Sequence, residues 1–494
     1  MPALTELLAE YEFQVKGSIN RIDVTGLELD SRRCFPGCVY FALAGRKHDG
    51  LNYVDEAVAR GAQAVILEQF PTHVPRGVAM IRVPDARDAM AYLSRAFYRT
   101  NERSMHLVAT TGTNGKTSTT AYIEHILSSA IGSAGVVGTG GARLNGEVLP
   151  SYSTTYTTPE SIELHRQLAR MSASGAKAVA LEASSVALDV GRLKYLSFAA
   201  GVFTNLSPEH LDDHHTVEAY WAAKLKLFEG LCEHAVVNDD EPHAEDIKRR
   251  MPGNFTTYGI DSAYADYRAT SIVYGRASTE YVLEHASLHT RVIVPTPGRF
   301  AVLNSLAAIA ATGQLGVRTD DAVYALKSIP GIAGRFEVKA DEQRDVAYVV
   351  DFAHTPAALQ NVLEAAGHIA SGRVAVVFGC GGDRDRTKRA AMGEVAAKFA
   401  DFTVITSDNP RTERPCAIIE EIAVGANRVS GASFVVEELR EAAIARAVNW
   451  ARAGDVVVIA GKGDEDYQDF GSKKLPFSDS SVVSDLIRVN GGGE

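Results

Sequence analysis

The sequence predicts an α/β protein of three domains, in which mainly parallel strands are covered by helices. Three observations predict this fold class. The 494-residue chain is long enough for about three domains. Apolar strand-like runs alternate with helix-like patterns along its length. A strand, a glycine-containing turn and a helix follow one another across residues 105–130, as in α/β domains that bind anions.

The first block, residues 1–101, is predicted to be a small α/β domain. Its apolar runs predict strands and its amphipathic runs predict helices. The expected strands are Cys38–Leu43 and Ala64–Glu68, and the expected helices are Val54–Gly61 and Ala86–Tyr98.

The second block, residues 102–331, contains runs that are apolar on both faces. Such runs are typical of a parallel sheet covered by helices. The expected strands are Met105–Thr110, Ala178–Glu182, Ala199–Thr204 and Ala235–Asn238, with a helix at Ser118–Ala130. Pro and Gly cluster at Ile329–Gly334, which is therefore the best candidate for a linker.

The third block, residues 332–494, predicts a doubly wound α/β domain because strands and helices again alternate. The expected strands are Val346–Asp351, Val374–Phe378, Phe402–Thr406 and Val456–Ile459. The expected helices are Ala357–Ile369 and Arg389–Phe399.

Composition narrows the class of ligand. The formal net charge of -11 argues against a nucleic-acid surface and fits a protein with small-molecule ligands. The N-terminal residues lack a long apolar core, and no run approaches about 18 apolar residues, so we expect a cytoplasmic protein without membrane insertion. Five scattered cysteines fit a reducing compartment, and Cys34 and Cys38 have no second pair for a zinc site.

Residues Thr111–Ser118 form the most informative motif. A strand that ends in glycines and leads into a helix directs backbone N–H groups and the helix dipole toward an anion. Lys116 adds a point charge and Thr117 a hydroxyl group for Mg²⁺. The general template has glycine where this chain has Thr110, so the match is to the shortened form GTNGKT. The alternative is a glycine-rich turn that binds nothing.

Further polar residues follow other strands of the second block. Glu182 closes one strand and His210 follows another, which suits ligands for a hard cation beside a triphosphate. Taken singly, each could equally be an ordinary polar loop residue. Lys224 and Lys226 share a helical pattern that reads as a solvated face, and nothing in the pattern separates the two.

Four polar segments follow strands of the third block. Asp351–Pro356 and Gly379–Asp385 are predicted to be ligand loops. Asp408–Arg411 could instead be a helix-capping turn, and Gly461–Asp466 could be a surface turn.

Together these segments resemble the Mur ligase family, the ATP-dependent amino-acid ligases of peptidoglycan precursor synthesis, over essentially the whole chain. The resemblance implies a first domain that binds a UDP moiety, a central P-loop ATPase-like domain and a Rossmann-like third domain that receives an amino acid. The segments that carry it, in chain order, are Leu29–Arg32, Pro36–Gly37, Phe41–Leu43, GTNGKTS, Thr157–Glu160, Glu182–Ser185, Phe203–Ser207, Asp351–Pro356, GCGGDRD and DNPR.

The resemblance also implies residue roles. ATP would be bound by Gly112, Thr113, Asn114, Gly115, Lys116, Thr117, Ser118, Asn304, Arg335, Asp351 and His354. Mg²⁺ would be held by Thr117, Glu182, His210 and a carbamylated Lys224, and Lys116, Glu182, His210 and Lys224 would be catalytic. The UDP-N-acetylmuramoyl-dipeptide would contact Ser31, Thr157, Thr158, Ser184 and Arg192. The amino acid would contact Arg389, Asp408, Asn409, Pro410, Arg411, Gly461 and Glu465.

The implied reaction activates a substrate carboxylate as an acyl phosphate, which the amine of an amino acid then attacks. DNPR with Arg389 and Glu465 implies meso-diaminopimelate as that amino acid, and we expect a monomer. The chain departs from the family pattern at Val186, Asp213 and Asp464, where the family has histidine, an aromatic residue and histidine.

Three alternatives remain open at this point. One is a divergent relative that adds L-lysine or another amino acid to a related nucleotide or acid. Another is an amide ligase acting on folate or a polymer, which would have no reason to keep the Ser31 region. The third is a non-catalytic nucleotide-binding protein, which would tolerate loss of Lys116, Glu182 or His210.

Overall fold

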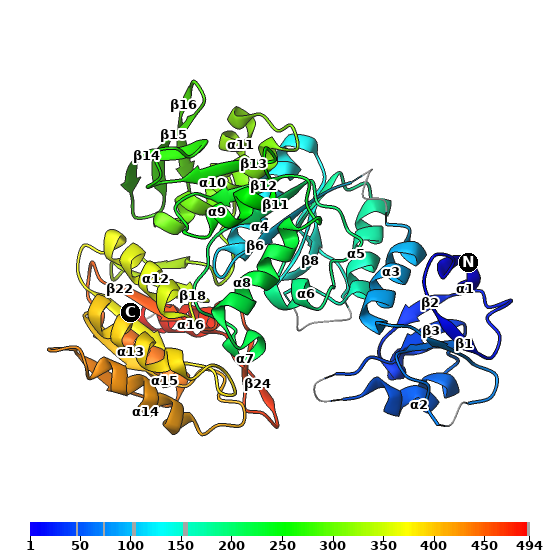
Figure 1. Cartoon of the computed structure of the whole chain (residues 1–494). Helices are drawn as coiled ribbons and strands as arrows, with labels where there is room; N and C mark the ends of the chain where they lie inside the picture. The colour runs from blue at the N-terminus through cyan, green and yellow to red at the C-terminus, as the bar shows by residue number, and fades with distance from the viewer. Residues whose placement is uncertain (46–47, 73–74, 101–104, 152–156, 492–494) are drawn as a thin grey trace. The chain divides into compact units, whose positions relative to one another are not determined.

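A computed structural model gives the structure of the protein (Figure 1) and describes all residues except 46–47, 73–74, 101–104, 152–156 and 492–494. The chain divides into two compact units. The first comprises Met1–Thr111, Ile131–Gly201 and Ala222–Ala235, and the second comprises Gly112–Ala130, Val202–Trp221 and Val236–Glu494. The predicted first domain lies wholly in the first unit and the predicted third domain wholly in the second. Residues of the predicted central domain are divided between them.

The N-terminal part of the first unit is a five-stranded sheet in the order β1-β5-β4-β3-β2, in which only β1 runs antiparallel to its neighbour. Apolar residues of β3 and β4 pack with those of α3 in one core. The strands are β1 (Gln14–Lys16), β2 (Gly26–Glu28), β3 (Cys38–Phe41), β4 (Ala64–Leu67) and β5 (Ala79–Arg82). The helices are α1 (Leu4–Leu7), α2 (Val54–Ala59) and α3 (Ala86–Tyr98), with 3-10 helices η1 (Ser31–Arg33) and η2 (Gly50–Tyr53).

The remainder of the first unit holds five strands in the order β6-β10-β7-β8-β9. The three strands β6, β10 and β7 are parallel, whereas β7, β8 and β9 are joined as antiparallel neighbours. The strands are β6 (His106–Thr111), β7 (Ala134–Gly138), β8 (Gly141–Leu144), β9 (Glu147–Val148) and β10 (Ala178–Glu182). The helices in this part are α5 (Ser161–Ala173) and α6 (Ser185–Asp189), and helix α8 (Val217–Leu225) ends here with η3 (Lys226–Phe228). Every residue of β10 is buried, as its uninterrupted apolar run predicts.

The second unit begins with helix α4 and continues with strands in the order β16-β15-β14-β13-β12-β11. Strands β13 and β14 are parallel, but β14, β15 and β16 form an antiparallel meander that the sequence analysis did not predict. The helices are α4 (Lys116–Ile131), α7 (Leu211–His214), α9 (Ala244–Arg250), α10 (Arg299–Gly313) and α11 (Thr319–Leu326). The strands are β11 (Ala200–Phe203), β12 (Ala235–Asn238), β13 (Phe255–Gly259), β14 (Tyr267–Tyr274), β15 (Thr279–His285) and β16 (Leu288–Val294).

Residues from Glu337 onward form a six-stranded sheet in the order β17-β18-β22-β19-β20-β21, parallel except for β17. The strands are β17 (Glu337–Asp341), β18 (Val346–Asp351), β19 (Val374–Phe378), β20 (Phe402–Ile405), β21 (Phe434–Val436) and β22 (Val456–Ala460). The helices are α12 (Pro356–Ile369), α13 (Thr387–Phe399), α14 (Pro415–Ala426), α15 (Arg440–Trp450) and α16 (Asp479–Gly491). Strands β23 (Tyr467–Asp469) and β24 (Lys474–Pro476) form a separate hairpin.

Helices cover both faces of this sheet, which confirms the predicted doubly wound arrangement. Val456 and Val458 of β22 pack into the core with α12, α13 and α14, whereas Val457 and Ile459 pack into the core with α15 and α16. This division follows from the two-residue period of a strand, which sends alternate side chains to opposite faces.

The predicted linker lies between α11 and β17, and its end is built into the last sheet. Gly334 has a φ of +65°, and its carbonyl accepts a hydrogen bond from Phe352 N (2.9 Å). A Cβ atom on Gly334 would lie 2.1 Å from Asp464 N, so only glycine fits at this position.

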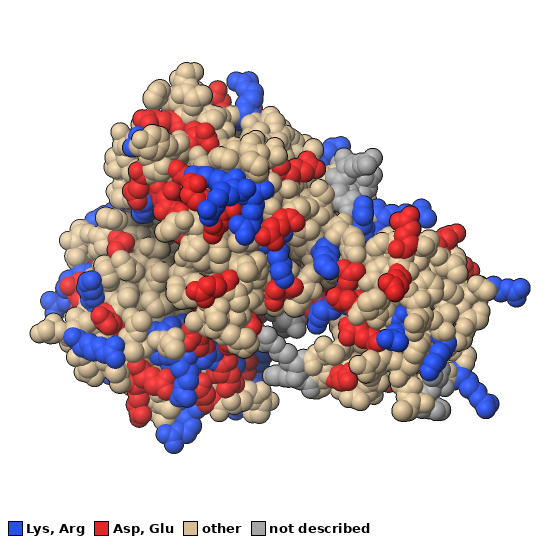
Figure 2. Space-filling view, in the orientation of Figure 1, with Lys and Arg blue, Asp and Glu red and all other residues tan. Residues whose placement is uncertain are grey.

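Acidic and basic side chains are interspersed on the face drawn in Figure 2 rather than gathered in one basic field. Among the described residues, no helix is both long and apolar enough to span a bilayer.

Candidate active site

The predicted phosphate loop has the geometry that its glycines imply. Strand β6 ends at Thr111 and helix α4 begins at Lys116. Gly112 (φ +149°) and Gly115 (φ +83°) lie in backbone regions that favour glycine. A Cβ atom on Gly112 would lie 1.9 Å from Thr204 Oγ1, and one on Gly115 would lie 2.6 Å from Asn304 Oδ1. Both positions therefore require glycine for space as well as for conformation.

The polar groups of this loop are held in place. Lys116 Nζ donates hydrogen bonds to the carbonyls of Gly112 (3.0 Å) and Thr113 (2.9 Å), so the ammonium group lies over the loop. Asn304 Oδ1 accepts a hydrogen bond from Thr119 Oγ1 (3.2 Å), which places this predicted nucleotide-site residue directly beside the loop. The arrangement offers an anion a positive charge together with the N-terminus of α4.

Two supporting residues of the loop were not predicted from the sequence. Asn205 accepts from Asn114 N (2.9 Å) through Oδ1 and donates to the Asn114 carbonyl (3.1 Å) through Nδ2. Thr204 Oγ1 donates to the same carbonyl (2.7 Å). Their signal was the FTNLS segment, to which the sequence analysis assigned no role.

Glu182, at the end of β10, is buried and tightly anchored. Its Oε1 accepts from Thr139 N (2.9 Å), and its Oε2 lies 3.2 Å from the Thr139 hydroxyl. That hydroxyl also lies 3.3 Å from Thr157 Oγ1. Thr139, which the sequence analysis missed, thus joins a predicted metal ligand to a predicted substrate residue.

The structure also brings Thr158, Ser184 and Arg192 to this place. Thr158 Oγ1 donates to the Glu182 carbonyl (2.7 Å) and accepts from Ser184 N (3.0 Å). Arg192 Nη1 donates to the Thr158 carbonyl (2.9 Å), and its Nη2 donates to Glu160 (2.7 Å). Ser31 lies apart from these bonds in η1, where its hydroxyl donates to Glu56 Oε2 (2.6 Å).

Burial separates the two lysines that the sequence pattern could not. Lys224, in α8, is only 1% exposed. Lys226 has a side chain that is 43% exposed and pairs with Asp189 Oδ1 at 2.7 Å. A buried ammonium group is costly, so Lys224 occupies a position that needs a special environment or a chemical modification.

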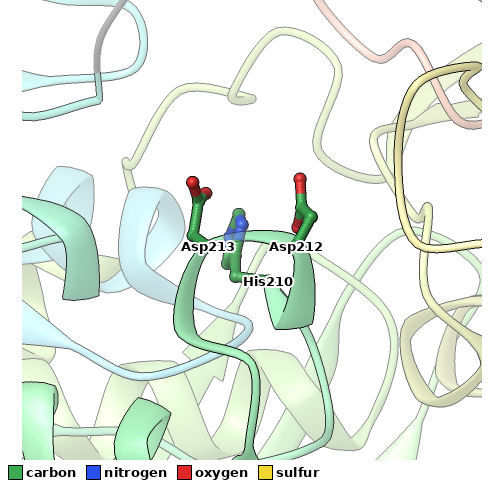
Figure 3. A group of neighbouring side chains, drawn as sticks. All are labelled: His210, Asp212 and Asp213. Carbon is green, nitrogen blue, oxygen red and sulfur yellow. The ribbon is translucent and has the colours of Figure 1, made fainter. Parts of the chain in front are cut away.

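His210 precedes helix α7 and lies beside two carboxylates (Figure 3). Its ligand atom and those of Asp212 and Asp213 all lie within 4.8 Å of one another. Carboxylate oxygens are the ligands that Mg²⁺ prefers, but Asp212 already accepts a hydrogen bond from Arg384 Nη1 (3.0 Å). Of these three residues, only His210 was predicted to be a metal ligand. The other predicted metal ligands are Thr117, Glu182 and Lys224. Thr117 and His210 belong to the second unit, and Glu182 and Lys224 to the first.

Arg335, Asp351 and His354 meet at the start of the last sheet. Arg335 Nη2 donates to Thr117 Oγ1 (3.2 Å), and its guanidinium lies 4.4 Å from the centre of the Phe352 ring. Asp351 accepts from the backbone N–H groups of Phe336 and Ala353, both at 2.7 Å. Burial raises the pKa of Asp351, which the charge of Arg335 only partly opposes.

The imidazole ring of His354 is neutral at neutral pH. Burial lowers its pKa below the ordinary value, and the nearby charge of Lys388 acts in the same direction. Nδ1 donates to the Phe352 carbonyl (2.8 Å), which leaves Nε2 as an acceptor.

The DNPR and GKGDE segments of the second unit lie against each other. Asn409 Nδ2 donates to Glu465 Oε2 (2.8 Å), and Lys462 Nζ donates to both Asn409 Oδ1 (3.1 Å) and Glu465 Oε2 (2.9 Å). A Cβ atom on Gly461 (φ +111°) would lie 2.6 Å from Asp408 Oδ2. Four predicted amino-acid contacts are thus neighbours, and one oxygen of Glu465 is already shared by two donors.

Arg411, the next residue of this group after Pro410, is partly exposed. Its backbone lies in the left-handed region (φ +51°), and its Nη1 donates to the Gly382 carbonyl (2.6 Å). A Cβ atom on Gly382 would lie 1.9 Å from the Pro410 carbonyl, so DNPR and GCGGDRD are also in contact.

Arg389 is placed differently from the other predicted amino-acid contacts. Its side chain is 0% exposed and donates to Glu413 Oε1 (2.8 Å), Glu413 Oε2 (3.0 Å) and Glu421 Oε2 (2.9 Å). In this arrangement its guanidinium neutralises two carboxylates of the protein and braces α13 against α14. Its assignment to a substrate carboxylate stays a prediction without support from these contacts.

Replacing Arg389 with methionine is expected to lower the free energy of unfolding by about 3 kcal/mol, because a buried ion pair would lose one partner. The measurement is the urea unfolding curve at pH 7. Arg386→Met is the matched control, since Arg386 pairs with the same Glu421 but is 61% exposed. Equal destabilisation by both variants would contradict the prediction.

The same ion pair predicts a pH dependence. The hydrogen bond from Arg389 lowers the pKa of Glu413 from 4.5 to about 2. Because the pKa of Glu413 is lower in the folded state, its ion pair with Arg389 adds to the free energy of unfolding above pH 4.5, and this addition is lost as the pH falls toward 2. The difference in unfolding free energy between wild type and Arg389→Met should therefore narrow over that range.

Three sequence models of Mur ligase domains match the chain. The model described as Mur ligase family, catalytic domain, matches residues 23–98, the Mur ligase middle domain matches residues 110–312, and the Mur ligase glutamate ligase domain matches residues 334–463.

Individual proteins are similar over nearly the whole length. The UDP-N-acetylmuramoyl-L-alanyl-D-glutamate--2,6-diaminopimelate ligase of Alkaliphilus metalliredigens (strain QYMF) is 39% identical over 494 residues, covering 99% of this chain and 98% of that protein. A solved structure of a ligase of the same name has a TM-score of 0.70 at 32% identity and covers 99% of both chains. The MurF ligase of Thermotoga maritima, solved with ADP, has a TM-score of 0.65 at 21% identity over 94% of this chain and 97% of that one, which shows a shared fold.

Proposed function

The chain belongs to the Mur ligase family, and we propose that it is the ATP-dependent ligase that adds meso-diaminopimelate to UDP-N-acetylmuramoyl-L-alanyl-D-glutamate in peptidoglycan precursor synthesis. The single observation that carries this proposal is the 39% identity, end to end, with a ligase of that name. The reaction needs ATP, so we assign it to the cytoplasm, and we keep the expectation of a monomer.

The proposed chemistry has two stages. The terminal D-glutamate carboxylate attacks the γ-phosphate of ATP and becomes an acyl phosphate, while the bond to the β-phosphate breaks and ADP leaves. The amine of the amino acid then attacks the activated carbonyl carbon, and phosphate leaves as the amide forms. The first stage makes a poor electrophile reactive, and no protein side chain has to act as a covalent nucleophile.

The chain's own residues divide this work. Lys116 and the N-terminus of α4 stabilise the charge that spreads over the transferring phosphoryl oxygens. Arg335, already bonded to Thr117, adds a second positive charge at the loop. Bound Mg²⁺ would neutralise phosphate charge, held by Thr117, Glu182, His210 and a carbamate on Lys224. The carbamate makes chemical sense because a cationic lysine would repel the metal, whereas its carbamate is a carboxylate analogue.

The substrates would bind to different groups of residues. We assign the UDP-N-acetylmuramoyl-dipeptide to Ser31 and to the cluster of Thr157, Thr158, Ser184 and Arg192. The amino acid is assigned to the DNPR and GKGDE segments. Arg411 offers a planar fork that suits the distal carboxylate of meso-diaminopimelate, a group that L-lysine lacks.

Replacing Arg411 with alanine is expected to raise KM for meso-diaminopimelate by about 10-fold to 100-fold, because a charge-assisted hydrogen-bond pair is lost. KM for ATP should stay within about twofold, since the phosphate loop is untouched. Arg414→Ala is the matched control, because Arg414 is an exposed arginine three positions further along the chain. Equal changes in both KM values would remove Arg411 from amino-acid selection.

The main alternative is a ligase of the same family that adds L-lysine or another amino acid. Asp464 favours it, because an exposed acid stands beside Glu465 where the family pattern has histidine. An added negative charge there would attract a more cationic amino acid or weaken binding of a second carboxylate.

The test is phosphate release from ATP with UDP-N-acetylmuramoyl-L-alanyl-D-glutamate and a panel containing meso-diaminopimelate, L-lysine, L-ornithine and the other common amino acids. Release that depends on meso-diaminopimelate alone is the expected result. Release that depends on another amino acid would support the alternative. Hydrolysis of ATP at the same rate without a carboxylate substrate would overturn the ligase reaction itself.

A further inference from the structure

The loop that carries His210 is held on one side by the phosphate loop. Thr113 N donates to the Asn205 carbonyl (2.9 Å). Ser207 N donates to Thr113 Oγ1 (3.0 Å), which lies 3.1 Å from the Ser207 carbonyl. Residues 205–207 are therefore hydrogen-bonded to the phosphate loop, and Leu206 N also donates to Glu241 Oε2 (3.3 Å).

Two ion pairs hold the same loop from the other side. Glu209 Oε1 accepts from Lys388 Nζ (3.0 Å), and both side chains are largely buried. Asp212 Oδ2 accepts from Arg384 Nη1 (3.0 Å), with the aspartate 28% and the arginine 51% exposed. Lys388 lies in the first turn of α13, and Arg384 lies in the GCGGDRD loop. Residues 384–388 belong to the predicted third domain, which is expected to receive the amino acid, and are here called the amino-acid-binding segment.

Each of the two pairs joins an acidic residue of the His210 loop to a basic residue of the third domain. Asp212 and Arg384 carry opposite formal charges and lie 3.0 Å apart, which favours the pair. Glu209 Oε1 also lies 3.8 Å from His354 Nε2, so the Asp351–Pro356 segment lies beside this acid.

His210 stands between these two acids in a backbone conformation that needs support. Its φ of +56° and ψ of +31° place it in the left-handed region, which residues other than glycine rarely adopt. Such a conformation persists only where the surrounding contacts fix it. The contacts at Glu209 and Asp212 lie one and two residues from His210, on either side of it.

We propose that Glu209 and Asp212 are positioning residues that make the placement of His210 depend on docking of the amino-acid-binding segment. The proposal rests on the proposed function, in which His210 is a metal ligand for phosphoryl transfer. When Lys388 and Arg384 are docked, the His210 loop is fixed from both sides. When they are not, the loop loses these two ion pairs, and activation of the carboxylate slows.

The test exchanges the charges of the exposed pair, using Asp212→Arg, Arg384→Asp and the double variant. In the full-length protein without substrates, each single variant is expected to speed backbone hydrogen exchange in residues 205–216 by about fivefold. Turnover should fall by a similar factor, while KM for ATP changes by less than about twofold. The double variant should recover most of both losses, because opposite charges face each other again.

Arg386→Asp is the matched control. Arg386 lies two residues from Arg384 and is similarly exposed, but it pairs with Glu421 rather than with the His210 loop. It is expected to leave exchange in residues 205–216 unchanged. An equal effect of Arg386→Asp, or a double variant no better than the singles, would overturn the proposal.

The exchange measurement also separates this proposal from the proposed function. The exchange measurement needs no substrate. If wild-type protein releases no phosphate with any amino acid, the ligase assignment is overturned, but that result does not decide whether the ion pairs hold the His210 loop. If hydrogen exchange rises in the single variants and recovers in the double variant while turnover is the same in all of them, the positioning role is overturned.

Discussion

Replacing Lys224 with alanine should lower the turnover of ATP-dependent phosphate release by a factor on the order of 10³, because the proposed carbamate would be a metal ligand worth several kcal/mol of transition-state stabilisation. Adding a short carboxylic acid such as formate or acetate should restore part of the loss. The added acid would fill the space of the buried side chain and supply the oxygen ligands of the carbamate. Initial rates with and without the acid make the measurement.

The chain supplies a matched control two residues away. Lys226→Ala removes a lysine from the same segment, but that side chain is 43% exposed and pairs with Asp189. It is expected to keep nearly full turnover and to gain nothing from added acids. Loss of activity in Lys224→Ala that neither bicarbonate nor any short acid relieves would count against the carbamate.

Replacing Lys116 with alanine should lower turnover by a factor on the order of 10²–10³, because the proposed function assigns its charge to the transferring phosphoryl group. In the structure this side chain contacts the carbonyls of its own loop, so its removal should leave the fold intact. Turnover under saturating ATP, compared with the thermal unfolding midpoint, makes the measurement.

Lys327→Ala is the control for Lys116, since Lys327 is an exposed lysine that follows helix α11. It should leave both turnover and the unfolding midpoint unchanged. If Lys116→Ala raises KM for ATP but leaves turnover unchanged, Lys116 binds ATP equally strongly in the ground state and in the transition state, and it does not stabilise the transition state selectively.

Several strands of the parallel cores could be predicted from the sequence because each is a short, uninterrupted apolar run, whereas the parallel strands β5, β7 and β21 were not predicted. Ala178–Glu182, Ala235–Asn238, Val346–Asp351 and Val374–Phe378 form strands with the predicted bounds. The antiparallel meander β14–β16 was missed because its residues alternate between buried and partly exposed positions. Such alternation carries a weaker apolar signal than a continuous apolar run.

The phosphate loop was the part of the site that the sequence predicted best, because its glycines, Lys116 and Thr117 are consecutive. Thr139 and Asn205 were missed because their roles depend on neighbours distant in the chain, Glu182 and Asn114. Arg389 shows the reverse difficulty. A motif position marks it for substrate, but two glutamates further along the chain, Glu413 and Glu421, already bind its guanidinium.

The fit of Gly334 against Asp464 N has a consequence for protein engineering. Residues 334–336 are bonded to the last sheet, through Gly334 to Phe352 and through Phe336 to Asp351. A chimaera that exchanges amino-acid specificity between relatives should therefore be joined before Ile332, so that this glycine travels with the transplanted sheet. With a junction after Phe336, the linker of one protein would pack against residue 464 of the other. Any side chain at position 334 would then collide with the backbone of residue 464.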